Sequence, residues 1–168
     1  IDISPSELSY SIRSQIESLE TIADSYGLEL NHIKAHGALY NQMIIDTELS
    51  NFYLDTIKDF KNKCSLYIPY KSEIEKIALK KGFSIIYEAF GDRNYNDDLS
   101  LVSRNNENAL ITDPESVVNH IKTIKETETV KTINGNFKKI KFDTICIHSD
   151  TNNSIEILKK INQEFGKS

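Results

Sequence analysis

The sequence predicts an α/β fold in which a mainly parallel sheet forms a single domain over residues 1–168. Segments with apolar residues at helical spacing alternate with short runs that are rich in β-branched and aromatic residues. Strands that alternate with helices of about ten residues or more are joined by crossovers, which favour parallel pairing. No stretch rich in Pro, Gly or Ser divides the chain, and 168 residues suit one domain with a sizeable core.

The first half of the chain predicts three helices and three short strands. Ser4 is a good N-cap, Pro5 suits the first helical position, and Gly27 ends the apolar helical repeat that follows. Two more helices are expected over residues 47–60 and over residues 72–81, the second closed by Gly82. Strands are expected over residues 28–34, 64–68 and 83–87.

The second half predicts a helix, a hairpin, a strand and a closing helix. Asp113 and Pro114 form a capping pair for a helix that runs to about Lys125. Asn134 and Gly135 are a strong hairpin signal, because both residues tolerate the positive φ of a tight turn. The hairpin strands, the next strand and the last helix are expected over residues 129–133 and 137–141, 144–147 and 154–165.

Composition and charge exclude several classes of protein. The net charge is −5, from 20 Lys+Arg against 25 Asp+Glu, and no basic stripe is present, so nucleic acid is not an expected partner. No apolar run approaches the ~20 residues that span a bilayer, and the first residues show no signal-peptide pattern. Cys64 and Cys146 lie in apolar stretches and are interpreted as small buried side chains in a reducing compartment. We therefore expect a cytoplasmic protein that does not contact the membrane.

Polar side chains gather where three of the predicted strands end. These clusters cover residues 34–41, 88–95 and 148–151. In parallel α/β folds the loops beyond the carboxyl ends of the strands converge on one face, which is where ligands bind. Segments far apart in the sequence can therefore form one site. P-loop, G-x-S-x-G, H-E-x-x-H and C-x-x-C motifs are absent, and His32 and His120 are expected to be structural or surface residues.

Each cluster also has a purely structural interpretation. The first can be a polar strand edge, with Gly37 forming a turn. Asp92 and Arg93 can form a structural ion pair, and Glu88 can anchor a loop. Thr151 is expected to cap the last helix. Capping does not explain His148, a titratable residue at the end of an apolar strand, so the three clusters together favour a functional site.

These clusters resemble the signature blocks of the LamB/YcsF family. Residues 34–41 (K-A-H-G-A-L-Y-N) resemble its K-P-H-G-A-L-Y-N block, and residues 88–95 resemble E-x-F-A-D-R-x-Y. Residues 101–104 (L-V-S-R) resemble L-V-P-R, and residues 146–150 (C-I-H-S-D) resemble C-V-H-G-D. Departures from these blocks include Ala35, Gly91 and Ser149. The blocks D-x-N-C-D-x-G-E, G-F-H-A-G-D and G-x-H-P of the family's N-terminal third are not present.

The resemblance implies a distorted (β/α) barrel of the polysaccharide-deacetylase-like superfamily, incomplete here and with the hairpin as an excursion. It implies a component of 5-oxoprolinase, which opens the lactam of 5-oxo-L-proline to L-glutamate with ATP and Mg²⁺. The implied partners are 5-oxoproline and two further subunits, of the B and C types. Either the N-terminal segment of the family or a second copy of this chain is expected to cover the incomplete barrel.

Roles for the site residues follow from the resemblance and from side-chain chemistry. Lys34 and Arg93 are expected to stabilise negative charge on the substrate, and His36 and His148 to transfer protons. Carboxylates that can act as general base, orient those groups or bind Mg²⁺ are Glu88, Asp92 and Asp150. Expected substrate contacts of second rank are Tyr40, Asn41, Tyr95 and Arg104.

Two alternatives stay open at this point. One is a metal-dependent hydrolase like the related deacetylases, with His36, His148 and Asp150 around one ion. The other is a non-catalytic subunit or fragment that acts as a binding module. Metal content and activity on addition of the N-terminal blocks separate these alternatives from a 5-oxoprolinase component.

Overall fold

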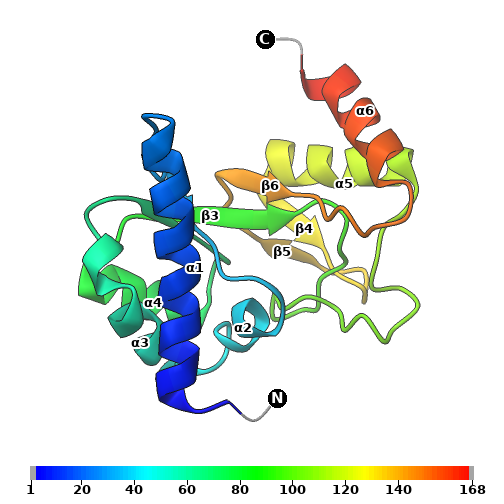
Figure 1. Ribbon diagram of the computed structural model, residues 1–168. Helices are drawn as coiled ribbons and strands as arrows, with labels where there is room; N and C mark the ends of the chain where they lie inside the picture. The colour runs from blue at the N-terminus through cyan, green and yellow to red at the C-terminus, as the bar shows by residue number, and fades with distance from the viewer. Residues whose placement is uncertain (1–2, 167–168) are drawn as a thin grey trace. The chain divides into compact units, whose positions relative to one another are not determined.

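The computed structural model describes residues 3–166, and its contacts divide the chain into two compact units, Ile1–Ile86 and Tyr87–Ser168. Both units combine helices with short strands (Figure 1), which confirms the predicted α/β class. Strand β3 (Ile85–Phe90) begins in the first unit and continues into the second. That the chain forms one domain over residues 1–168 stays a prediction.

The long first helix of the first unit, α1 (Pro5–Ser25), begins as the sequence predicts. Glu7 N–H donates to Ser4 Oγ (3.3 Å), and Ser4 N–H donates to Glu7 Oε2 (3.0 Å), so two free backbone donors are satisfied reciprocally. The same bonds lower the pKa of Glu7, the side-chain bond with Ser4 first and the backbone bond second. The helix buries Ile12 and contacts α3.

The other elements of the first unit pack around one apolar core. They are β1 (His32–Ile33), α2 (Gly37–Gln42), α3 (Thr47–Thr56), a 3₁₀ turn (Lys58–Phe60), β2 (Ser65–Ile68) and α4 (Glu73–Lys81). β1 and β2 pair in parallel, and the Leu66 N–H donates to Ser84 O next to the start of β3. Helices α3 and α4 contact each other, and Leu54 and Ile57 are fully buried between the elements of this unit.

Helix α4 follows the sequence closely, whereas the strand expected over residues 28–34 is shorter. Ser72 caps α4 and Gly82 ends it in a left-handed conformation. Strand β1 has only two residues, and the first residue of the expected strand belongs to the C-terminal turn of α1: Leu28 N–H donates back to Ala23 O, and Gly27 has φ +69°. The sequence also did not predict the short helix α2 (Gly37–Gln42).

The second unit contains the rest of the predicted elements. They are the end of β3, α5 (Pro114–Thr127), β4 (Thr129–Lys131), β5 (Phe137–Lys139), β6 (Thr144–Cys146) and α6 (Ser154–Phe165). β6 pairs in parallel with the end of β3, and α5 contacts both α6 and β4 (Figure 1). Asp113 caps α5 through Ser116 N–H, as predicted. The strand expected over residues 83–87 lies two to three residues further along the chain.

The predicted hairpin is present, and Asp97 holds its turn. β4 and β5 pair in antiparallel fashion around Gly135, whose φ is +84°. The Asp97 carboxylate accepts hydrogen bonds from Thr132 Oγ1 (2.5 Å) and from the side-chain amides of Asn134 and Asn136 (3.0 Å each). These bonds, that of Thr132 foremost, lower the pKa of Asp97 to about 2.

The low pKa of Asp97 predicts a specific loss of stability in acid. The folded-state pKa lies below the unfolded value of about 3.9, so the stabilisation is fully present above that value and is lost as the pH falls towards 2. Asp97→Asn should flatten the free energy of unfolding between about pH 4 and pH 2, measured by urea titration. Asp24→Asn, which removes an exposed carboxylate of α1, should leave the slope unchanged. Equal slopes for Asp97→Asn and the original chain would contradict the role of Asp97.

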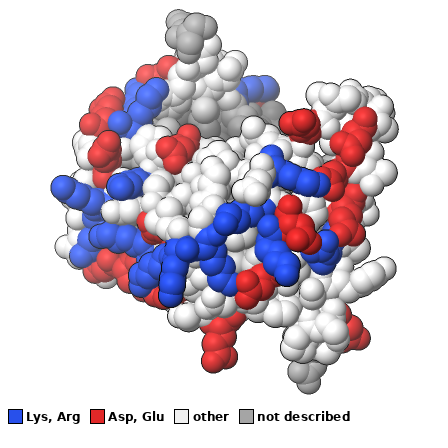
Figure 2. Space-filling model, turned by 90° about the vertical axis from the view of Figure 1, so that its left-hand side faces the viewer, with Lys and Arg blue, Asp and Glu red and all other residues white. Residues whose placement is uncertain are grey.

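The surface carries charges of both signs. Figure 2 shows one face of the molecule, on which Lys and Arg side chains form a band with Asp and Glu side chains between and around them. Exposed ion pairs of the first unit include Lys81 with Asp55 (2.5 Å) and Arg13 with Asp59 (2.9 Å). Such pairs are screened by salt and each adds little stability. No helix among residues 3–166 has both the length and the apolar character needed to cross a bilayer.

Candidate functional site

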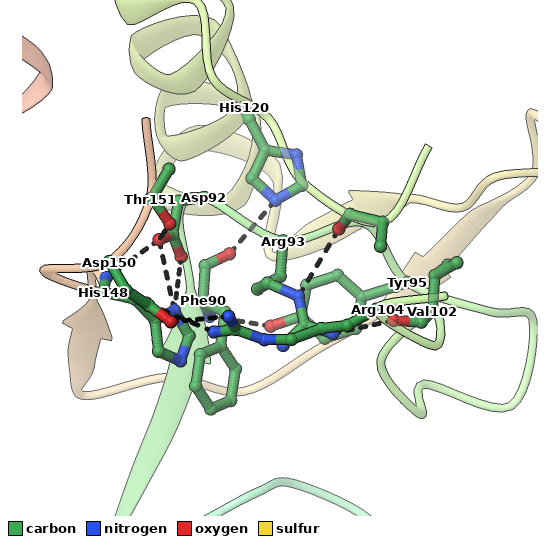
Figure 3. A network of polar contacts seen from close by, with 11 residues as sticks. Phe90, Asp92, Arg93, Tyr95, Val102, Arg104, His120, His148, Asp150 and Thr151 are labelled. Atoms are coloured by element: carbon green, nitrogen blue, oxygen red, sulfur yellow. Dashed lines mark hydrogen bonds and ion pairs between the residues drawn. The ribbon is translucent and has the colours of Figure 1, made fainter. Parts of the chain in front are cut away.

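Asp92 and His148 lie together at the ends of two paired strands. Phe90 of β3 is paired with Cys146 of β6, so the residues two positions beyond each strand meet. His148 Nδ1 lies 3.0 Å from Asp92 Oδ1 and 3.1 Å from Asp92 Oδ2, and His148 backbone N–H donates to Asp92 Oδ2 (2.8 Å) (Figure 3). The sequence prediction that strand ends bring distant polar residues together is confirmed for this pair.

The Asp92 carboxyl group is fully buried and ionised. Burial by itself raises the pKa of Asp92, but hydrogen bonds from His148 and Thr151 outweigh it, so the net pKa is lowered. Three donors to one carboxylate satisfy its lone pairs away from water. Asp92 is therefore a fixed negative charge next to Nδ1 of the His148 imidazole.

This arrangement fixes the tautomer of His148. A carboxylate only accepts hydrogen bonds, so His148 Nδ1 carries the proton that points at Asp92. In the neutral ring Nε2 is then the proton acceptor, and no residue among 3–166 bonds to it. The ring stacks on Phe90 with centroids 5.4 Å apart and 8° between planes, and 25% of the side chain is exposed. A carboxylate that orients a histidine in this way serves either a general base or a metal ligand.

Thr151 holds Asp92 and does not cap the last helix, so the capping prediction was wrong. Its Oγ1 donates to Asp92 Oδ2 at 2.6 Å, and its side chain is buried. The N-cap of α6 is Asn153, in a left-handed conformation and with no side-chain capping bond. The hydroxyl donates its proton to the ionised carboxylate, and Thr151 lies two residues before the N-cap position of α6.

Removing the Thr151 hydroxyl should weaken any chemistry that depends on Asp92 and His148. Thr151→Val keeps the shape but removes one donor to Asp92, so the pKa of Asp92 rises and turnover falls by about tenfold. The acid limb of the pH–rate profile should move to higher pH, and Thr151→Ser should restore it. A profile of Thr151→Val that matches the original chain would show that Thr151 has no positioning role.

Arg93 and Arg104 occupy different environments in the second unit. Arg93 is buried, donating from Nη2 to Val102 O (2.7 Å) and from Nε to Ala109 O (3.4 Å), so it holds the loop that carries Arg104. Arg104 is exposed, and its Nη1 lies 2.7 Å from Asp150 Oδ2. This bond raises the pKa of Arg104 and lowers the pKa of Asp150. Arg104 and Asp150 thus form an exposed ion pair beside His148 (Figure 3).

Other predicted site residues of the second unit are buried. Glu88 is paired with Thr144 of β6 and has 4% of its surface exposed. Tyr95 is buried; its Oη accepts a hydrogen bond from Phe90 N–H (2.7 Å), and burial raises its pKa. His120 bonds through Nε2 to Phe90 O (3.3 Å) and stacks on Tyr95, which fits the structural role expected of it. These contacts support the end of β3, from which Asp92 follows.

The first unit holds the remaining predicted residues around the short helix α2. Lys34 lies just after β1, with its Nζ 5.7 Å from the centroid of the buried Tyr40 ring. His36 is the exposed N-cap residue of α2, and Asn41 is exposed near its end. Gly37 has φ +61°, so the turn expected there is present. That these residues join Asp92 and His148 in one site stays a prediction.

The two cysteines and the potential metal ligands complete the set of reactive side chains. Cys64 is buried, Cys146 is half-buried, and neither forms a disulfide. No group of three or more His, Cys, Asp or Glu side chains within residues 3–166 is arranged to hold a metal ion. The metal set His36, His148 and Asp150 stays a prediction. Sequence reasoning missed Thr151 as a partner of Asp92, which lies 59 residues away in the sequence.

The sequence of the chain matches a known protein family. The LamB/YcsF family model matches residues 1–168. The A subunit of 5-oxoprolinase from Pyrococcus abyssi is 35% identical over 167 residues, which make up 98% of this chain and 66% of that protein. The A subunit of 5-oxoprolinase from Campylobacter jejuni is 38% identical over 154 residues, 91% of this chain and 60% of that protein. The chain thus spans somewhat less than two thirds of the length of these relatives.

A solved structure gives the same result for the fold. The lactam utilization protein from Thermus thermophilus superimposes with a TM-score of 0.85 at 27% identity, over 98% of this chain and 67% of that one. Together with the parallel strands, this likeness confirms the predicted fold class, an incomplete β/α barrel with a hairpin excursion. The match to the family model extends over the whole sequence, and the chain belongs to the LamB/YcsF family.

Proposed function

We propose that the chain is part of the A subunit of a cytoplasmic, ATP-dependent 5-oxoprolinase that hydrolyses 5-oxo-L-proline to L-glutamate with subunits of the B and C types. Relatives with this subunit name and the likeness to a lactam utilization protein support the proposal. The observation that carries it is the Asp92–His148 pair, because opening a lactam requires a positioned group that moves protons.

In this proposal His148 Nε2 is the atom that moves the proton. It takes a proton from the attacking water as the water oxygen bonds to the ring carbonyl carbon. It returns a proton to the ring nitrogen when the carbon–nitrogen bond breaks, which leaves the free amine of glutamate. Asp92 stays ionised throughout and stabilises the imidazolium that forms between these two steps. Thr151 positions Asp92 and touches no reacting atom.

The chemistry of the Arg104 and Asp150 side chains suits the binding of ATP with Mg²⁺. A guanidinium binds phosphate or carboxylate oxygens in pairs, and a carboxylate is a ligand that Mg²⁺ accepts. Both groups are exposed but bonded to each other, so binding of ATP or of the 5-oxoproline carboxylate requires their ion pair to open. ATP would activate the lactam oxygen by transfer of its terminal phosphoryl group; ring opening would then leave an acyl phosphate, which a second water would hydrolyse to glutamate and inorganic phosphate. Lys34 and His36 keep the roles expected from their chemistry, whereas the buried Arg93 holds the loop that carries Arg104.

The test is glutamate formation by the full-length protein that carries this chain, assembled with the other two subunits. We expect L-glutamate and ADP to form in equal amounts, and only when 5-oxo-L-proline and ATP are both present. Formation of glutamate without ATP but with a stoichiometric transition metal would favour the metal-dependent hydrolase. Full activity of the other two subunits alone would make the chain a binding module.

A further inference from the structure

A polar groove of about 720 Å³ lies in the second unit, between α5, the β4–β5 hairpin and the loop that follows β3. Helix α5 contributes Ser116, Asn119, His120 and Thr123, of which the last three follow the first by three, four and seven residues and so share one face of the helix. The opposite face of α5 packs into the core. α5 also contacts β4, so the two walls of the groove are adjacent (Figure 1).

Some of the polar groups that line the groove already make hydrogen bonds within the unit, and others do not. The hydroxyls are used within the unit: Thr132 Oγ1 donates to Asp97, Ser116 Oγ to Asp113 and Thr123 Oγ1 to Asn119 O. The groove therefore has fixed polar walls. Their two carboxylate partners already accept several bonds each and do not line the groove.

The available groups are amides, an ammonium and an imidazole nitrogen. The side chains of Asn108, Asn119 and Lys131 line the groove, and none makes a hydrogen bond or ion pair to another of the residues 3–166. His120 donates from Nε2 to Phe90 O, and burial lowers its pKa, so the ring is neutral near pH 7 and Nδ1 is an acceptor. The lining thus offers amide donors and acceptors, one cation and no carboxylate.

We propose that this groove binds a small polar solute that carries an anionic group, a carboxylate or a phosphate, next to hydrogen-bonding groups. The Lys131 ammonium holds the anion, and the Asn108 and Asn119 amides hold the neutral part. The volume lies in the range of sites for small molecules. The groove is separate from the proton-transfer pair; the bonds that connect the two include His120 with Phe90 O and Ile111 N–H with Asp92 O (2.9 Å). The inference does not depend on the proposed function.

The experiment is a titration of the ¹⁵N-labelled chain with inorganic phosphate, AMP and L-glutamate, followed at the side-chain amide signals of asparagine. At least one probe should shift the Asn108 and Asn119 signals with a Kd of about 1 mM or tighter. Binding by phosphate and AMP but not glutamate assigns the anion as a phosphate. Binding by glutamate alone assigns it as a carboxylate.

Charge reversal supplies the control. Lys131→Glu should weaken the binding by about 10-fold to 100-fold, the effect expected when one charge-assisted hydrogen bond is lost. Lys139→Glu makes the same change at an exposed residue of β5 that does not line the groove, and should leave Kd unchanged. The proposal is overturned if none of the three probes saturates these signals, or if both variants weaken binding equally.

Discussion

Replacing His148 by alanine is expected to lower kcat for the proposed 5-oxoproline hydrolysis by about 10²-fold to 10⁴-fold, the usual contribution of a positioned general acid–base. The ring is the part of the Asp92–His148 pair that reaches solvent, and its Nε2 is the atom available to substrate. Asp92 keeps two donors in the variant, the backbone N–H of residue 148 and Thr151 Oγ1. The melting temperature should therefore fall by no more than about 4 °C.

Two comparisons separate catalysis from stability. Asp92→Asn should lower kcat as well, and the double variant should be no slower than His148→Ala alone, because residues that act as a unit are not additive. His32→Ala removes a histidine that stacks on Tyr67 (3.8 Å between centroids), outside the strand-end clusters, and should leave kcat unchanged. A His148→Ala variant with normal kcat would exclude it from proton transfer. A collapse of its melting temperature would make the residue structural.

Replacing Gly91 by alanine is expected to lower the free energy of unfolding by about 1–3 kcal/mol through overpacking. A Cβ at this position would lie 2.8 Å from Ile147 Cδ1 and 2.9 Å from Ile121 Cδ1. The family blocks have Ala at position 91 and Val at position 147. Valine lacks the Cδ1 atom, so we expect Gly91 and Ile147 to compensate for each other, one being smaller and the other larger than in the family blocks. The measurement is urea unfolding of the variants.

A double-mutant cycle tests this compensation. Ile147→Val alone should cost about 0.5–1.5 kcal/mol, because it leaves a small cavity beside Gly91. In the Gly91→Ala background the same change should cost less or restore stability, since the new Cβ fills that space. Recovery should be partial, because Ile121 still contacts the added methyl group. Strictly additive effects of the two substitutions would show that positions 91 and 147 are not coupled.

Local signals in the sequence predicted most elements well. Ser4 and Glu7, Ser72 and Gly82, and Asn134 with Gly135 each act within a few residues, so their hydrogen bonds follow from the sequence itself. The strand expected over residues 28–34 failed for a local reason too, since the end of α1 uses Leu28 N–H. Helix α2 was missed because only six residues form it, too few for a helical repeat to be visible.

Of the candidate site, the sequence predicted only the features that follow from the order and direction of the strands. Parallel strand ends predicted that residues near Asp92 and His148 meet, and they do. The partner of Thr151 was not predictable, because Asp92 is far away in the sequence and a capping role is equally consistent with a threonine before a helix. Arg93 was assigned to substrate from its charge alone. Its burial against Val102 O and Ala109 O depends on the path of a loop, which no sequence pattern specifies.

The Asp92–His148 pair is tested most directly by the protonation of the His148 ring, observed by ¹⁵N NMR of the chain labelled at its histidines. A His148→Ala spectrum assigns the signals, and a pH titration identifies the neutral form. We expect Nδ1 to carry the proton and Nε2 to be bare, because the buried Asp92 carboxylate accepts from Nδ1. A neutral ring with its proton on Nε2 would contradict the Asp92–His148 pair as the proton-transfer centre.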